Sequence, residues 1–129
     1  GSLDKSAKLW DLKSSKFLTS FIGHIDYINA VVCANSSRRG FTASSDRTVK
    51  EWDLENKKLN KTFNGASCCV SVNISNNDST LYSGHSDGTV KIWSVNHHEK
   101  PEHILDFHDD KVISIEVLKN EFQILTLSK

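Results

Sequence analysis

The sequence lacks the features that mark several classes of protein. It has a single proline, and its 16 Lys and Arg residues equal its 16 Asp and Glu residues. Such a balance provides no whole-chain field that would attract nucleic acid, an anionic membrane or an acidic substrate. No apolar run reaches the roughly 20 residues that a membrane-spanning helix needs, and the N-terminus has no signal-peptide pattern. We therefore expect a soluble globular segment that neither inserts into a membrane nor binds nucleic acid.

Cysteine is also scarce, with Cys33, Cys68 and Cys69 as the three examples. An odd number without C-x-x-C spacing favours a reducing compartment over a disulfide framework. On a strand, the neighbouring Cys68 and Cys69 would point to opposite faces. A reducing cytosol or nucleus fits these observations best, and we expect a cytoplasmic protein with buried or half-buried thiols. A reactive or metal-binding thiol is the alternative.

The chain does contain an internal repeat. The segments "SLDKSAKLWDL" from Ser2, "SSDRTVKEWDL" from Ser44 and "HSDGTVKIWSV" from His85 align without gaps. In each of them a Lys follows the Asp by four positions, and a Trp follows that Lys by two. The aligned residues recur every 41 or 42 positions, as Asp4, Asp46 and Asp87, and as Trp10, Trp52 and Trp93.

The residues between these segments are typical of short β-strands. Runs of β-branched and aromatic residues are separated by Asn, Ser, Asp and Gly. Pro101 stands near the start of the last run, so this strand is expected at a sheet edge, where a missing N–H is tolerated. One period contains the runs 27–34, 40–44, 48–54 and 58–63, and the next contains 68–74, 80–84, 89–95 and 102–107.

A four-stranded unit that repeats every 40 to 45 residues with a Trp-Asp pair is the signature of a β-propeller blade. In Gly23-His24, Trp10-Asp11 and Trp52-Asp53 the chain resembles the WD-repeat (WD40) family, although Trp93-Ser94 departs from the pair. The resemblance implies an all-β fold, a β-propeller of four-stranded antiparallel blades. About three blade-equivalents of an expected seven-bladed ring are present. They are the end of one blade (1–22), two full blades (23–64 and 65–107) and the start of another (108–129).

Three blades cannot close a ring, because propellers have about four to eight. We expect the remaining blades to come from the same parent chain or from other copies. Uncovered strand edges and blade faces lead us to predict that the isolated segment aggregates or unfolds with poor cooperativity.

The resemblance also implies a hydrogen-bonded chain within each blade, from the Trp indole through a Ser or Thr hydroxyl and a His to the Asp of the tight turn. Such a chain satisfies polar groups that a packed sheet would otherwise bury without partners. One blade has Ala66 in place of the His, so we expect it to be less tightly braced. The members are His24, Thr42, Asp46 and Trp52 in the complete set, Ser83, Asp87 and Trp93 in the next, and His108 and Thr126 in the last.

Catalysis is the functional alternative for these residues, since a His between a hydroxyl and a carboxylate is also the order of a hydrolase triad. A constellation that repeats with the blades and is joined to Trp indicates a scaffold instead. A catalytic nucleophile occurs once, beside an oxyanion hole. We therefore expect no enzymatic activity and no cofactor.

Two further groups of residues have side chains that could bind ions. The pair Arg38-Arg39 is expected in a solvated turn, with contact to a phosphate or an acidic partner as the alternative. A solvated loop is favoured over a metal site, because no C-x-x-C or H-x₃-H pattern accompanies the histidines His97, His98, His103 and His108.

Propellers of this family are mostly rigid platforms for peptides and protein domains, which implies protein partners on the ring face. Tyr27 is the best anchor, because exposed Tyr is favoured at binding hot spots. The family register places the other contact positions, each with a solvated face as the alternative, at Leu3, Asn29, Ser45, Cys69, Ser71, Ser86, Lys111 and Ile113. Aromatic residues of the outer strands are expected to pack between blades: Phe17, Phe21, Phe63 and Phe107.

A narrower resemblance rests on "KTFNGASCCVSVNI" followed by "LYSGHSDGTVKIW". This run is similar to the C-terminal WD-repeat domain of the autophagy sixteen-like proteins, which scaffold conjugation of a ubiquitin-like modifier to membrane lipid. It implies a scaffold in autophagosome formation. The alternative is a substrate receptor of a ubiquitin ligase or another complex scaffold. Adaptors of the cullin-four type tend to carry Arg two positions after the Trp-Asp pair, where this chain has Lys13, Glu55 and Asn96.

Overall fold

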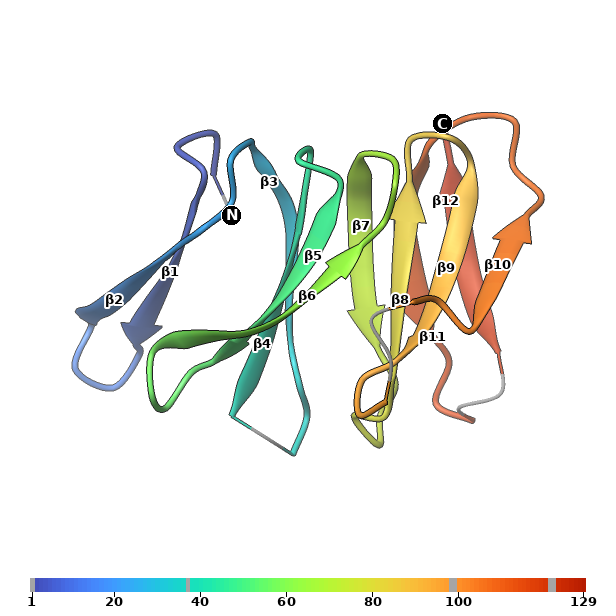
Figure 1. Ribbon diagram of the computed structural model, residues 1–129. Helices are drawn as coiled ribbons and strands as arrows, with labels where there is room; N and C mark the ends of the chain where they lie inside the picture. Colours follow the sequence, from blue (N-terminus) through green and yellow to red (C-terminus); the bar gives the residue numbers. More distant parts are fainter. Residues whose placement is uncertain (1, 37, 98–99, 121–122) are drawn as a thin grey trace.

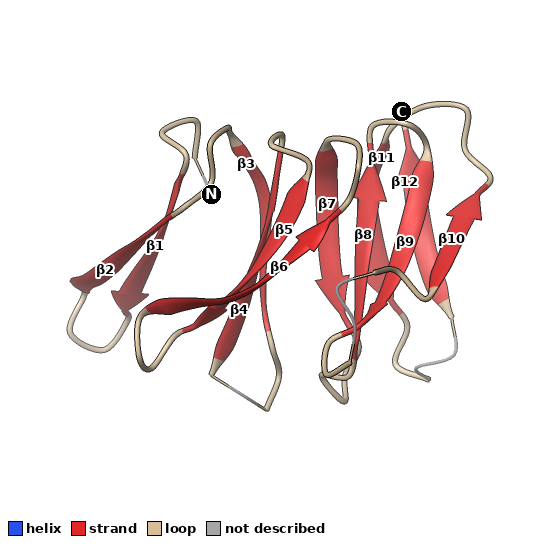
Figure 2. Cartoon of the chain, in the orientation of Figure 1, coloured by secondary structure: helices blue, strands red, loops and turns tan. Residues whose placement is uncertain are grey.

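The described part of the chain forms twelve β-strands (Figures 1 and 2). The computed structural model describes residues 2–36, 38–97, 100–120 and 123–129. None of these residues lies in a helix, so none belongs to a helix that could cross a membrane. Two four-stranded antiparallel sheets stand side by side, and a two-stranded sheet flanks each of them (Figure 1). The fold is therefore all-β and follows the order of consecutive propeller blades.

Each four-stranded sheet is formed by strands that are consecutive in the sequence. The first sheet has the spatial order β3 (Ile28–Cys33), β4 (Arg39–Ser44), β5 (Thr48–Asp53) and β6 (Lys58–Asn64). The second has the order β7 (Cys69–Ile74), β8 (Thr80–His85), β9 (Thr89–Ser94) and β10 (His103–Asp106). Strand β10 lies at the sheet edge, as the preceding proline predicted.

The two flanking sheets are hairpins. Strand β1 (Ser6–Asp11) pairs with β2 (Lys16–Ile22), and β11 (Val112–Val117) pairs with β12 (Ile124–Ser128). By sequence they correspond to the third and fourth strands of one blade and to the first and second strands of another. The blade boundaries 1–22, 23–64, 65–107 and 108–129 stay a prediction.

The aspartate of the repeated segment closes the tight turn between two strands. In the β4–β5 turn, Asp46 Oδ1 accepts hydrogen bonds from the Thr48 N–H at 2.9 Å and from the Thr48 hydroxyl at 2.6 Å. The residue after the aspartate has a positive φ in each such turn, 65° at Lys5, 72° at Arg47 and 83° at Gly88. A short side chain that bonds the backbone two residues on stabilises turns of this kind. This local chemistry explains why an aspartate recurs with the strands.

The apolar core lies between neighbouring sheets. The Phe63 ring on β6 meets the Trp93 ring on β9 edge to face, with centroids 5.5 Å apart. Phe21 on β2 packs against Trp52 on β5 at the preceding pair of sheets, with centroids 5.3 Å apart and the ring planes tilted by 44°. Such aromatic pairs contribute about 0.5–1.5 kcal/mol beyond the area that they bury. Each sheet is therefore stabilised through its neighbour.

The prediction for the outer-strand aromatic residues was half correct. Phe21 and Phe63 are buried, whereas Phe17 is 49% exposed and Phe107 is 87% exposed. The prediction was wrong for Phe107 because it lies beyond the end of β10. Leu105 takes the position of Phe63, since each of them pairs with the valine that follows the turn threonine.

Candidate functional site

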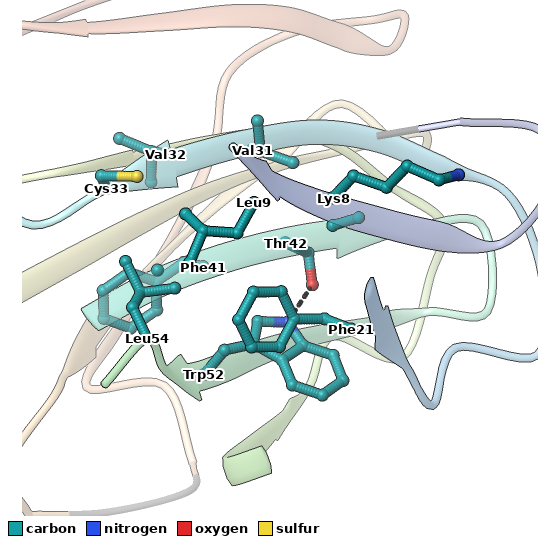
Figure 3. A pocket seen from close by; sticks show the side chains of 12 residues that line it. Lys8, Leu9, Phe21, Val31, Val32, Cys33, Phe41, Thr42, Trp52 and Leu54 are labelled. Carbon is teal, nitrogen blue, oxygen red and sulfur yellow. Dashed lines mark hydrogen bonds between the residues drawn. The ribbon is translucent and has the colours of Figure 1, made fainter. Parts of the chain in front are cut away.

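A chain of buried hydrogen bonds runs through the first four-stranded sheet. The Trp52 indole N–H donates to the Thr42 hydroxyl at 2.8 Å (Figure 3), and Thr42 Oγ1 lies 2.7 Å from His24 Nε2. His24 Nδ1 lies 2.7 Å from Asp46 Oδ2. Because a carboxylate only accepts, His24 Nδ1 carries the proton, and Nε2 accepts the Thr42 O–H. The directions of all three bonds are thus mutually consistent.

Burial keeps the His24 ring neutral beside an ionised carboxylate. Burial lowers the pKa of His24 more than the neighbouring Asp46 raises it. Burial raises the pKa of the Asp46 carboxyl, but hydrogen bonds from Thr48 and His24 outweigh this effect and place the pKa below its ordinary value. The Asp46 carboxylate also accepts the Ile25 N–H at 3.1 Å, so it ties the loop before β3 to the β4–β5 turn.

The second four-stranded sheet has a similar chain, but its imidazole comes from another position. The Trp93 indole N–H donates to the Ser83 hydroxyl at 2.8 Å, and Ser83 Oγ lies 2.8 Å from His85 Nε2. His85 Nδ1 faces the Ser67 carbonyl at 3.4 Å. His85 therefore provides the ring that Ala66 cannot. Whether this sheet is less tightly braced stays a prediction.

Asp87 is the predicted member that the structure does not bring into this chain. It is exposed, and it accepts hydrogen bonds from the Thr89 N–H at 3.1 Å and from the Thr89 hydroxyl at 2.6 Å. It therefore serves the β8–β9 turn, as Asp46 serves the β4–β5 turn, without the additional link to an imidazole.

Glycine at position 65 makes room for the relocated ring. A Cβ added to Gly65 would lie 2.4 Å from His85 Cε1 and 2.8 Å from Cys69 Sγ. Ser83 and His85 lie on the same face of β8, because side chains alternate along a strand. Sequence reasoning missed His85 because it looked for a histidine after the glycine. The signal it could have used is a Ser and a His two residues apart on one strand.

The half-sheets hold the remaining members of the predicted set, His108 and Thr126, and also Trp10 of the repeated segment, which that set does not include. His108 Nε2 lies 2.7 Å from Thr126 Oγ1, which joins the β10–β11 loop to β12. Trp10 on β1 is 54% exposed and meets Phe17 edge to face, with centroids 5.6 Å apart. The assignment of one common bracing role to all these residues remains a hypothesis.

Cys69 and His85 form a pair that needs to be examined for covalent catalysis, since Cys69 Sγ lies 3.7 Å from His85 Nδ1. Both residues are fully buried. Burial raises the pKa of the Cys69 thiol to about 12 and lowers the pKa of His85 to about 4. A cysteine nucleophile needs a lowered pKa and access to a substrate. The pair is suited to packing and unsuited to nucleophilic attack.

A small apolar pocket lies between β1 and the first four-stranded sheet (Figure 3). Its volume is about 100 Å³, and Leu9, Val31, Phe41 and Trp52 are among the residues that line it. Sites for drug-sized ligands and cofactors have volumes of about 300–1,000 Å³. This pocket is therefore too small to hold a cofactor.

The residues predicted to contact partners lie mainly on what we call the loop edge, the loops along the upper edge of Figure 1. Tyr27 is 47% exposed there, Ser86 is exposed, and Ser45 and Lys111 are half-buried. Ile113 is exposed near the start of β11. The loop edge comprises residues 2–5, 23–27, 45–47, 65–68, 86–88 and 107–111.

Two of the predicted contact positions are wrong, because Cys69 and Ser71 are buried. Cys69 pairs with the last residue of β8 as Ile28 pairs with the last residue of β4. The loop before β7 is one residue shorter than the loop before β3, so a gapless alignment shifts the register by one. The half-buried Cys68 and Val70 occupy the positions that were assigned to Cys69 and Ser71.

Asn29 is exposed, but its amide already joins the two central sheets. Asn29 Nδ2 donates to the Cys69 carbonyl at 2.8 Å and to the Ser45 hydroxyl at 3.0 Å. A partner that used this amide would have to compete with these contacts. Its observed contacts are therefore structural.

Asp78 is a buried residue that sequence reasoning missed. Its carboxylate accepts the Asn35 N–H at 2.7 Å, the Ser36 N–H at 2.8 Å and the Ser36 hydroxyl at 2.6 Å. Burial raises the pKa of Asp78, but these hydrogen bonds hold it at about 2. The carboxylate thus joins the β7–β8 turn to the β3–β4 loop. No sequence pattern distinguishes it from an ordinary turn aspartate.

The arginine pair and the histidines are the residues that could bind ions. Within the ranges that the structure describes, no cluster of three or more His, Cys, Asp or Glu residues could hold a metal ion. His98 lies outside those ranges. Arg38 pairs with Glu55, and Arg39 Nη1 lies 3.7 Å from the buried Glu51 carboxylate. Both arginines therefore face carboxylates of their own sheet.

Comparison of the sequence with known proteins finds a repeat family and several similar proteins. Residues 15–53 and 57–94, together more than half of the chain, match the family described as WD domain, G-beta repeat. The chain is 32% identical over 119 residues to Autophagy-related protein 16 of Arabidopsis thaliana, covering 92% of this chain and 23% of that protein. It is 34% identical over 130 residues to Protein tipD of Dictyostelium discoideum, covering 99% of this chain and 21% of that protein. It is 27% identical over 154 residues to Cell division control protein 4 of Saccharomyces cerevisiae, covering 98% and 20%. The chain thus spans less than a quarter of each of these relatives.

Proposed function

The chain belongs to the WD40-repeat family of protein-interaction scaffolds, and we propose that it acts without catalysis in autophagosome formation. In this proposal it is part of the WD-repeat domain of an autophagy-related sixteen-like protein in the cytoplasm. Its partners are proteins or peptides on the propeller face. The remaining blades come from the same parent chain or from other copies. No nucleic acid, membrane insertion or cofactor is involved.

The observation that supports the scaffold function is that the buried polar residues bond within and between the sheets, whereas the loop edge carries exposed polar residues. The Trp52 and Trp93 indoles donate to hydroxyls inside their own sheets. Asn29 and Asp78 join the two central sheets to each other. The loop edge, with Tyr27, remains as the exposed surface. Loops held by a rigid scaffold are the usual place for binding residues. The similarity to an autophagy protein over 92% of the chain supports the narrower role.

A gene-replacement experiment tests the proposal. The natural gene is replaced by a form that lacks residues 1–129 of this chain, and autophagosomes and the lipid-linked ubiquitin-like modifier are counted after starvation. We expect fewer autophagosomes and restoration by the intact gene. Unchanged autophagy in the deleted form would remove the autophagy role and leave the scaffold function open.

The second candidate is a substrate receptor of a ubiquitin ligase or another complex scaffold. The similarity to a cell-division protein over 98% of the chain favours keeping it. Against the cullin-four type stand Lys13, Glu55 and Asn96, where such adaptors tend to carry Arg. Co-purification of cullin subunits, without components of the autophagy conjugation machinery, would favour this candidate.

A further inference from the structure

The three junctions between neighbouring sheets can be compared position by position on the loop edge. Strands β3, β7 and β11 each begin with a buried residue. The residues immediately before them are, in order, Tyr27, Cys68 and Lys111. An aromatic residue at the first junction thus corresponds to a small residue at the second and to a charged residue at the third.

Two further positions show the same trend. The residue before the turn aspartate is, in order, Leu3, Ser45 and Ser86. The last residue of the outer strand, which pairs with the first residue of its neighbour, is in order Ile22, Asn64 and Asp106. Because polar residues occupy these positions at two junctions, the fold itself does not require apolar side chains there. The apolar residues at the first junction need another explanation.

We call Leu3, Ile22, Ile25 and Tyr27 the apolar cluster. Their exposed fractions are 74%, 78%, 79% and 47%, respectively. The Ser2 carbonyl accepts the first N–H of β3 at 3.2 Å, so the turn that carries Leu3 lies against the loop that ends at Tyr27. Single exposed apolar residues are common, but several at one junction indicate an interaction surface.

The third junction carries the opposite chemistry. A Cβ added to Gly88 would lie 2.1 Å from the His108 carbonyl oxygen, so the loops 86–88 and 107–111 are in close contact. Lys111 and Lys129 also lie here, joined by a backbone hydrogen bond of 3.3 Å. Negative charge exceeds the charge of these two lysines, because four exposed aspartates gather here as what we call the acidic cluster: Asp87, Asp106, Asp109 and Asp110.

We propose that the loop edge binds an extended basic segment of a partner protein. The segment places a bulky apolar side chain on the apolar cluster and a Lys or Arg side chain on the acidic cluster. The inference rests on the proposed scaffold function and specifies the chemistry of its partner. Small residues at the second junction, Ser45 and Cys68, let an extended backbone pass between the two clusters.

Each cluster has a distinct physical role in this complex. Burial of the apolar side chain against Tyr27 provides affinity, since Tyr is a rigid anchor with a large contact area. Charge complementarity at the acidic cluster orients the segment and speeds its association. Because exposed charges are screened by salt, binding should weaken as the ionic strength rises.

A selection from random peptides displayed on phage, against the full natural polypeptide that contains this chain, tests the inference. We expect enriched peptides with an aromatic or leucine residue and a Lys or Arg at a constant separation. The Kd of the most enriched peptide is then measured by fluorescence polarisation. Replacing Leu3 and Tyr27 together by Ser should weaken it by about tenfold or more, as expected for a hot spot.

Two matched variants complete the design. Asp109→Asn with Asp110→Asn should reduce both the affinity and its salt dependence, while Asp87 is left intact because it closes a turn. Leu12→Ser is the control, because Leu12 is 90% exposed in the β1–β2 turn, away from the loop edge, and should leave the Kd unchanged.

Three outcomes would overturn the inference. They are enrichment of acidic peptides, failure to enrich any peptide, and peptide binding that the Leu3 and Tyr27 replacement leaves unchanged. The last of these would leave the scaffold function intact, because the protein would still bind a peptide at another surface. Unchanged autophagy in the gene-replacement experiment would contradict the autophagy role but would not affect the peptide result.

Discussion

The two central sheets provide an imidazole to a buried hydroxyl from two different positions. In both, a buried Trp indole donates to a hydroxyl that contacts an imidazole. In the β3–β6 sheet the ring is His24 from the preceding loop, and the Asp46 carboxylate holds its second nitrogen at 2.7 Å. In the β7–β10 sheet the ring is His85 from the sheet itself, and a backbone carbonyl faces its second nitrogen at 3.4 Å. The comparison teaches that the buried hydroxyl needs an imidazole partner, whichever element provides it.

The largest expected effect concerns the glycine that admits the relocated ring. Gly65→Ala forces a Cβ to 2.4 Å from the His85 ring, whereas a Cβ at Gly23 would meet Trp52 at 3.1 Å. We expect Gly65→Ala to lower the free energy of unfolding by about 3 kcal/mol, the upper range for overpacking, and Gly23→Ala to lower it by less than about 1 kcal/mol. Urea unfolding of the two variants, each made in the full-length protein, measures the difference. Equal effects would mean that His85 does not occupy this space.

The next effect is on pH dependence. The pKa of His85 is about 4 in the folded chain and near 6.5 when unfolded, so the unfolded chain takes up the proton first as the pH falls. Stability should therefore decrease between about pH 6.5 and pH 4, by on the order of 3 kcal/mol from this residue. His24 acts in the same direction, because its pKa is also lowered.

A non-titrating side chain isolates the contribution of His85. His85→Gln keeps a hydrogen-bonding partner for Ser83, so unfolding measured between pH 7 and pH 4 should show a weaker pH dependence than the parent. His24→Gln serves as the matched comparison. A parental pH profile in His85→Gln would contradict the lowered pKa.

A smaller effect separates the two turn aspartates. Asp46→Ala leaves the buried His24 N–H without its acceptor and should cost about 2 kcal/mol, in the range for an unsatisfied buried donor. Asp87→Ala removes bonds within an exposed turn and should cost about 0.5–1 kcal/mol. The midpoints of thermal unfolding rank the two variants. If Asp87→Ala is the more destabilising, Asp87 must hold a buried group after all.

The smallest effect leaves stability unchanged and tests the corrected register of β7. Cys69 is fully buried with a pKa of about 12, whereas the adjacent Cys68 is half-buried. Iodoacetamide should therefore label Cys68 and leave Cys69 unmodified in the folded chain, since alkylation needs an accessible thiolate. Mass spectrometry of the digested protein locates the label, and Cys33, which is exposed, is the positive control. Labelling of Cys69 before Cys68 would restore the original register.

Much of the fold could be predicted because the signals are local. The strand runs, the tight turns and the Trp-Asp spacing depend on residues within one repeat, and the observed strands follow the predicted runs closely. The complete set around His24 was assigned from the resemblance to the WD-repeat family, which implies where each member stands relative to the repeated Trp.

The errors arose where a position depends on a neighbouring element. A loop shortened by one residue moved Cys69 into the core, and Phe107 lies in solvent because it falls beyond the end of β10. His85 was missed because the space beside Gly65 admits its ring, and no position of the repeat marks that space. A gapless alignment of the repeats shows neither a shortened loop nor a side chain that comes from another position.

The sequence by itself determined the strands, their turns and their grouping into repeats, because alternation, turn chemistry and Trp-Asp spacing act over a few residues. Only the tertiary structure decided that His85 joins the second buried chain, that Asp78 joins two sheets, and that Cys69 and Ser71 are buried. These outcomes depend on packing between sheets, where a single methyl group at Gly65 would meet the His85 ring at 2.4 Å. Distances between separate elements of this kind are not encoded in any local pattern.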